Sequence, residues 1–110
     1  MEIVSAADID AKLTEWQSGA ATAAEVHEWA VARYATHKWE PESDSVNEVL
    51  AELDMLDVNL TTIADVPALK SALRSESAAD ILAAHFQAID FAARKLQLAA
   101  DPLYERFCKR

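Results

Sequence analysis

The sequence has one glycine and three prolines among its 110 residues, and this scarcity of helix-breaking residues is its strongest constraint on the fold. Tight turns often need glycine, so such a chain should have long regular segments and few tight turns. Runs of β-branched residues are also few, so these segments are expected to be helices. We predict a single helical domain over residues 1–110, an all-α bundle of about four to five helices with one long C-terminal helix.

The first predicted helix covers residues 6–18. Ser5 can cap it, and Asp8 stands three positions later, which is the spacing of a capping box. Gly19 suits the left-handed position that commonly ends a helix. This helix therefore has both a start signal and a stop signal.

The second predicted helix begins at Thr22 and Glu25, which again have capping-box spacing, and it runs to Lys38. It ends there because the residue before Pro41 is pushed out of the helical region. The short connection between the two helices favours an antiparallel pair. We expect residues 40–44 to form an exposed acidic loop.

A third helix is predicted from a capping box at Ser45 and Glu48 to about Asp57. Its apolar positions repeat at threes and fours, which is the pattern of one buried face. These positions are Val46, Val49, Leu50, Leu53 and Leu56. The positions left to face solvent or a partner are Glu48, Glu52, Asp54 and Met55.

The C-terminal half is predicted to contain the longest helix of the chain. Residues 58–63 alternate like a strand but are too few to form a sheet alone, so we expect an extended connector. Asp65 then caps a short helix with Pro67 in its first turn. The long helix covers about residues 77–99, with one apolar face on which His85 lies.

Charge is distributed unevenly along the chain. The formal net charge is −9, with 13 acidic and 3 basic side chains in residues 1–57 and 6 acidic and 7 basic ones in residues 58–110. No Lys or Arg lies between Lys38 and Lys70. An acidic surface repels phosphate, which disfavours nucleic acid as a partner, and it attracts a basic protein. Solubility alone would also explain the acidity.

No catalytic or metal-binding motif is present. The helical spacings that bind metals do not occur at His27, His37 or His85. Cys108 has no His or Asp placed by sequence to activate it, and Gly19 alone cannot form a phosphate loop. We therefore expect no enzymatic activity, no metal and no cofactor.

The cysteine content and the N-terminus bear on the cellular compartment. A single cysteine excludes an internal disulfide, which fits a reducing cytoplasm. The N-terminal residues lack the basic and apolar regions of a signal peptide. No run approaches the roughly 18 apolar residues of a membrane span. We therefore expect a cytoplasmic protein that does not enter a membrane.

Trp39 stands beside the acidic run, at the end of the second predicted helix. A half-exposed aromatic residue among carboxylates is typical of a binding hot spot surrounded by steering charge. Capping of the bundle's end by Trp39 and simple solvation of the charged face are the alternatives. The candidate partner-binding residues are Trp39, Glu40, Glu42, Asp44, Glu48, Glu52, Asp54 and Met55.

Residues 13–29, LTEWQSGAATAAEVHEW, resemble the start of small colicin-like immunity proteins, including those paired with contact-dependent-inhibition toxins. The shared features are an apolar helix, a Gly-containing turn, a Thr/Ala-x-Glu helix start and an aromatic-rich helix. The resemblance implies a small, acidic, cytoplasmic protein. It also implies tight binding to a basic nuclease toxin domain, which the protein would block as an acidic mimic of nucleic acid.

An alternative interpretation is a structural or regulatory subunit of a larger complex, for example a helical homodimer. The Ala-rich positions 78–100 would let the helices of two copies approach closely along the second face of the long helix. The sequence leaves both interpretations open.

Overall fold

The chain folds mainly into helices, and a computed structural model describes residues 2–36 and 39–109 of it. Helices account for 66% of the residues, so the prediction of a mainly helical fold is confirmed. The described part also contains a small two-stranded sheet. The elements in chain order are β1 (Glu2–Val4), α1 (Ala6–Ser18), α2 (Ala23–Thr36), β2 (Trp39–Pro41), α3 (Asp44–Asp54), the 3-10 turn η1 (Ile63–Asp65), α4 (Val66–Leu73), α5 (Ala78–Gln87), α6 (Phe91–Leu98) and α7 (Glu105–Cys108).

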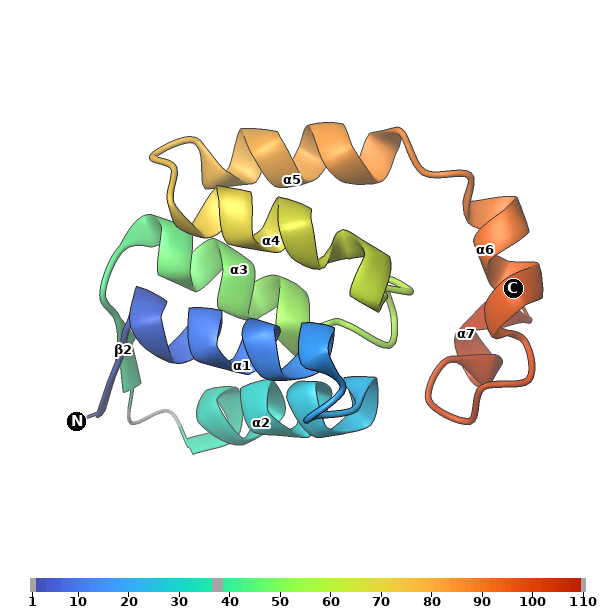
Figure 1. Cartoon of the computed structure of the whole chain (residues 1–110), viewed down its shortest axis with the longest axis horizontal. Helices are drawn as coiled ribbons and strands as arrows, with labels where there is room; N and C mark the ends of the chain where they lie inside the picture. Colours follow the sequence, from blue (N-terminus) through green and yellow to red (C-terminus); the bar gives the residue numbers. More distant parts are fainter. Residues whose placement is uncertain (1, 37–38, 110) are drawn as a thin grey trace.

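The helices form a stacked body with a separate pair at one end. Helix α3 packs against α1, α2, α4 and α5, and α4 packs closely against α5. Figure 1 shows α6 and α7 at the end of the molecule opposite the N-terminus, running across the ends of the body helices. None of the described helices has the length and apolar character needed to cross a membrane.

The core is centred on α3, as the periodicity of its sequence predicts. The five predicted positions, from Val46 to Leu56, have no exposed surface. Ile9 and Leu13 of α1 and Val26 of α2 are equally buried. Full burial of such a side chain contributes about 1.5–3 kcal/mol, so this cluster is the main source of stability in the body.

The caps predicted for α1 and α2 are confirmed. The amide of Asp8 donates to Ser5 Oγ at 3.1 Å, and the amide of Ser5 donates back to the Asp8 carboxylate at 3.1 Å. Gly19 has a φ of 84° at the C-terminus of α1. Thr22 and Glu25 make the same reciprocal pair of bonds, at 3.1 and 3.0 Å.

The parallel pairing of β1 with β2 is absent from the sequence prediction. Glu2 lies opposite Trp39 and Ile3 opposite Glu40, so the expected acidic loop at residues 40–44 is wrong at its start. The amide of Glu42 extends the pairing by donating to the carbonyl of Val4 at 3.0 Å. A strand of three residues has too few positions for alternation to be recognised, and its partner comes from a distant segment.

Helix α3 begins before the predicted start. The amide of Val46 donates to Ser43 Oγ at 3.2 Å, so Ser43 is the cap and the prediction of Ser45 is wrong. Ser45 Oγ instead donates to the carbonyl of Ser75. The helix also ends earlier than predicted, at Asp54. Serine is a favoured cap residue at either position, but the hydroxyl of Ser45 is occupied by its bond to Ser75.

The segment after α3 is compact, so the prediction of an extended connector is wrong. Residues 55–60 form successive turns, and the amide of Asn59 donates to the carbonyl of Met55 at 2.9 Å. Leu60 has a φ of 55° and is buried. A left-handed residue with a side chain costs roughly 1–2 kcal/mol, which burial of Leu60 offsets.

The prediction of a single long C-terminal helix is also wrong, because the helix is interrupted between α5 and α6. Asp90 caps α6 by accepting from the amide of Ala93 at 3.1 Å. Helix α6 has no fully buried residue, and Leu96 on its predicted apolar face is 82% exposed. The continuous helix face invoked for a homodimer is therefore absent.

Candidate functional site

Several predicted partner-binding residues lie on one exposed stripe of α3 and the adjoining turn. Asp44, Glu48 and Met55 are exposed and follow helical spacing, and Met55 is 42% exposed. Glu40 and Glu42 are exposed on β2 and directly after it. Strand β2 packs against both α2 and α3, so the carboxylates of Glu40 and Glu42 lie at the end of the body where β2 meets these two helices.

An aromatic pair adjoins this stripe. The rings of Tyr34 and Trp39 meet edge to face with centroids 4.8 Å apart, and both residues are half-buried. Burial raises the pKa of Tyr34, and the negative charges of Asp54 and Glu48 raise it further. These two carboxylates therefore act electrostatically on Tyr34. We call Tyr34, Trp39, Glu40, Glu42, Asp44, Glu48, Asp54 and Met55 the acid–aromatic surface.

Glu52 does not face solvent in the way the sequence predicts. It is half-buried, and its Oε1 accepts from Asn59 Nδ2 at 3.1 Å and from Thr61 Oγ1 at 3.2 Å. Burial raises the pKa of this carboxyl. Glu52 and Glu48 thus have different surroundings, half-buried and exposed, although they lie one turn apart on the same helix.

A cluster that the sequence does not predict surrounds Asp65, which is fully buried. Arg94 donates to both of its oxygens, from Nη1 at 2.8 Å and from Nη2 at 3.2 Å. His85 Nε2 lies 2.8 Å from Asp65 Oδ1. The amide of Thr62 also donates to this carboxylate at 2.7 Å, so the side chain of Asp65 turns back toward the start of η1. Asp65 therefore makes no side-chain cap for α4, contrary to the sequence prediction.

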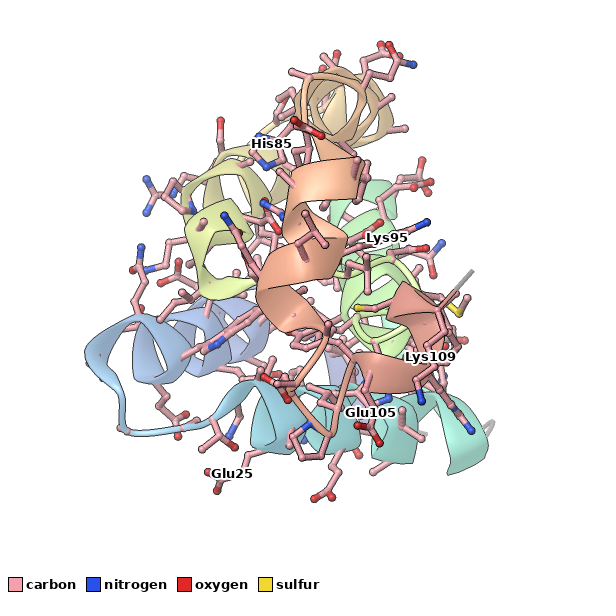
Figure 2. All side chains as sticks on the ribbon, turned by 90° about the vertical axis from the view of Figure 1, so that its right-hand side faces the viewer. Glu25, His85, Lys95, Glu105 and Lys109 are labelled. Atoms are coloured by element: carbon pink, nitrogen blue, oxygen red, sulfur yellow. The ribbon has the colours of Figure 1, made fainter. Side chains whose placement is uncertain are left out.

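The break between α5 and α6 makes this convergence possible. His85 and Arg94 are nine positions apart, which in one straight helix is about 13.5 Å along the axis and half a turn around it. Figure 2 shows His85 of α5 beside the upper end of α6, with Lys95 on the other side of its ribbon. The one sequence signal was a histidine on an apolar face, which indicates a buried partner but does not identify it.

The other predicted polar candidates have structural contacts or lie outside the description. His27 joins α2 to the end of α3, with Nδ1 3.2 Å from the carbonyl of Leu53 and Nε2 3.5 Å from the carboxylate of Asp57. Cys108 is half-buried against the core, and His37 lies outside the described residues. Among residues 2–36 and 39–109, no group of three His, Cys, Asp or Glu side chains could hold a metal ion.

Two clefts border the α6–α7 pair. The larger has a volume of about 540 Å³ and lies among the end of α3, the following turns, α5, α6 and α7. Its lining includes Glu52, Asn59 and Lys95 together with apolar side chains. The smaller, of about 370 Å³, lies between α6 and the loop that joins α1 to α2.

No family model matches the chain, and neither a curated protein nor a solved structure is significantly similar to it.

Proposed function

We propose that this protein is a non-enzymatic binding module that recognises a basic protein through the acid–aromatic surface. The observation that carries the proposal is the half-buried Tyr34–Trp39 pair, with the exposed carboxylate of Glu40 directly after Trp39 on β2. Aromatic residues bordered by charge are the usual composition of a binding hot spot. The charge steers the partner and the rings supply contact area.

The carboxylates of this surface lack ion pairs within the described part of the chain, and Glu42 Oε2 accepts from the backbone amide of Ala6 at 2.7 Å. No described Lys or Arg forms an ion pair with Glu40, Glu42, Asp44, Glu48 or Asp54. Asp44 and Glu48 are one helical turn apart, and such like-charged pairs cost a few tenths of a kcal/mol. A partner's cations would remove this repulsion on binding.

The most concrete form of the proposal is an immunity protein that inhibits a basic, nuclease-type toxin domain. Two features support it: the resemblance of residues 13–29 to colicin-like immunity proteins, and the acidity of the N-terminal half. A basic active-site groove would dock against the stripe of Asp44, Glu48 and Met55. Trp39 would supply an apolar anchor at its edge.

The test is charge reversal on this stripe, with a cationic nuclease domain encoded by the neighbouring gene as the probe. Glu48→Lys should weaken binding at least tenfold and reduce its salt dependence, because a rim charge affects steering and affinity together. Glu105→Lys, at an exposed acid on α7, is the matched control and should bind like the wild type. Unchanged affinity and salt dependence for Glu48→Lys would contradict the proposal.

A further inference from the structure

The larger cleft gathers every phenylalanine of the chain. The sequence contains three, and Phe86 from α5, Phe91 from α6 and Phe107 from α7 all line this one cavity. Leu60 and Leu82 complete its apolar wall. A volume of about 540 Å³ is within the range typical of small-molecule sites. Three helices therefore supply one aromatic-lined cavity.

Glu52 is the acidic side chain in this lining. Its two described hydrogen bonds, from Asn59 and Thr61, both reach Oε1. Burial raises its pKa, and the neighbouring charges that act on it, Asp65 and Glu48, are both negative. No described cation forms an ion pair with it. A half-buried carboxylate without a described ion pair attracts a positively charged donor.

The aromatic rings contribute contact area more than charge recognition. Arg94 lies over the ring of Phe91 at 5.9 Å, and Arg106 lies over the ring of Phe107 at 4.8 Å. One face of each of these rings is thus already occupied by a cation. The charged side chains of the lining are Glu52 and Lys95, and Glu52 is the one that can accept from a ligand's donor, whereas the apolar wall selects the ligand's body.

We propose that this cleft binds a small organic ammonium ion, a primary amine with an aromatic or branched apolar body. The ammonium donates to Glu52 Oε2, and the body packs against Phe86, Phe91 and Phe107. The site is separate from the acid–aromatic surface, so it does not depend on the function proposed for that surface.

Calorimetric titration of the whole chain with three compounds of one shape tests the proposal. Phenethylamine should bind, and phenethyl alcohol and 3-phenylpropionate should bind at least tenfold more weakly. Equal or tighter binding of the carboxylate would overturn the proposal, because it would assign recognition to Lys95. Failure of phenethylamine, tryptamine and isoamylamine to bind at millimolar concentration would overturn it as well.

Two variants locate the ligand's charge. Glu52→Gln keeps an oxygen acceptor for Asn59 and Thr61 but removes the charge. It should weaken the binding of phenethylamine at least tenfold. Glu76→Gln, the same change at an exposed acid outside the cleft and outside the acid–aromatic surface, is the matched control and should leave this affinity within twofold. Equal affinities for wild type and Glu52→Gln, with unchanged circular dichroism, would refute the role of Glu52. Chemical-shift changes confined to the three phenylalanines and Glu52 would confirm the cleft.

Discussion

The body of the molecule and its C-terminal arm are held in place by different forces. We define the body as residues 2–87 of the described chain and the arm as residues 91–108. The buried apolar core comes almost wholly from the body, and Tyr104 is the only residue of the arm in it. The other apolar side chains of the arm that pack against the core are only partly buried: Phe91, Leu98, Leu103, Phe107 and Cys108. Polar bonds also attach the arm, from Arg94 to Asp65 and from the hydroxyl of Tyr104 to the carbonyl of Thr61 at 2.5 Å.

This difference explains why the larger cleft lies where it does. Apolar burial draws body helices together until no space remains, because every contact surface is favourable. The partial apolar packing of the arm and its few directed bonds position it without closing the space beside it. The arm therefore lies across the ends of the body helices (Figure 1). The aromatic-lined cavity lies between the arm and the body.

Asp65→Ala should have the largest effect, because it leaves the guanidinium of Arg94 nearly buried and without its carboxylate. Breaking a buried pair in this way costs about 3–5 kcal/mol. Urea unfolding followed by circular dichroism measures the loss. Asp80→Ala, at an exposed site on α5, is the control. A loss below about 1 kcal/mol for Asp65→Ala would show that other contacts hold the arm.

The same change, leucine to alanine, made once in the body and once in the arm tests the comparison directly. Leu53→Ala removes a fully buried side chain from the body and should cost about 2–5 kcal/mol. Leu96→Ala removes an 82% exposed side chain from the arm and should change stability by less than about 0.5 kcal/mol. Equal losses in urea unfolding would mean that the arm is packed as tightly as the body.

Asp90→Ala removes the side chain that starts α6 and should destabilise the protein by about 1 kcal/mol. Asp90→Ser retains an oxygen for the amide of Ala93 and should stay within a few tenths of a kcal/mol of wild type. Thermal unfolding of the pair measures the difference. If the two variants had the same midpoint, capping by Asp90 would not be needed to break the long helix.

The smallest effect is expected from Glu52→Gln as a function of pH. Burial raises the pKa of Glu52 above its usual value near 4.5, so the folded chain binds this proton more tightly than the unfolded chain. The stability that protonation provides is complete below pH 4.5 and is lost as the pH rises through the raised pKa. The unfolding midpoint of Glu52→Gln should therefore rise relative to that of the wild type as the pH increases toward neutrality. A constant difference across pH would contradict the effect of burial.

Where neighbouring residues decide the structure, the sequence prediction succeeded. The buried stripe of α3 and the caps at Ser5 and Thr22 depend on spacings of three and four positions, which the helix itself imposes. The prediction of Ser45 as the cap of α3 failed, since Ser43 is an equally suitable cap residue and Ser45 bonds to Ser75 instead.

The candidate site shows the same division. The exposure of Asp44, Glu48 and Met55 follows from helical period once the buried face of α3 is known. The inward position of Glu52 could not be predicted, because its partners Asn59 and Thr61 come from a turn that forms only in the folded chain. The helical repeat of apolar residues identifies which residues are outside the core, but it does not identify which other segments of the chain contact them.

The sequence by itself therefore determined a helical body, its apolar faces and the concentration of acid in the N-terminal half. These properties are local or additive. Only the tertiary structure decided the break before α6, the burial of Asp65 with Arg94 and His85, and the cleft that gathers three phenylalanines. The physical reason is that a buried charge is stable only when its partners converge, and that convergence depends on three-dimensional positions that sequence spacing does not encode.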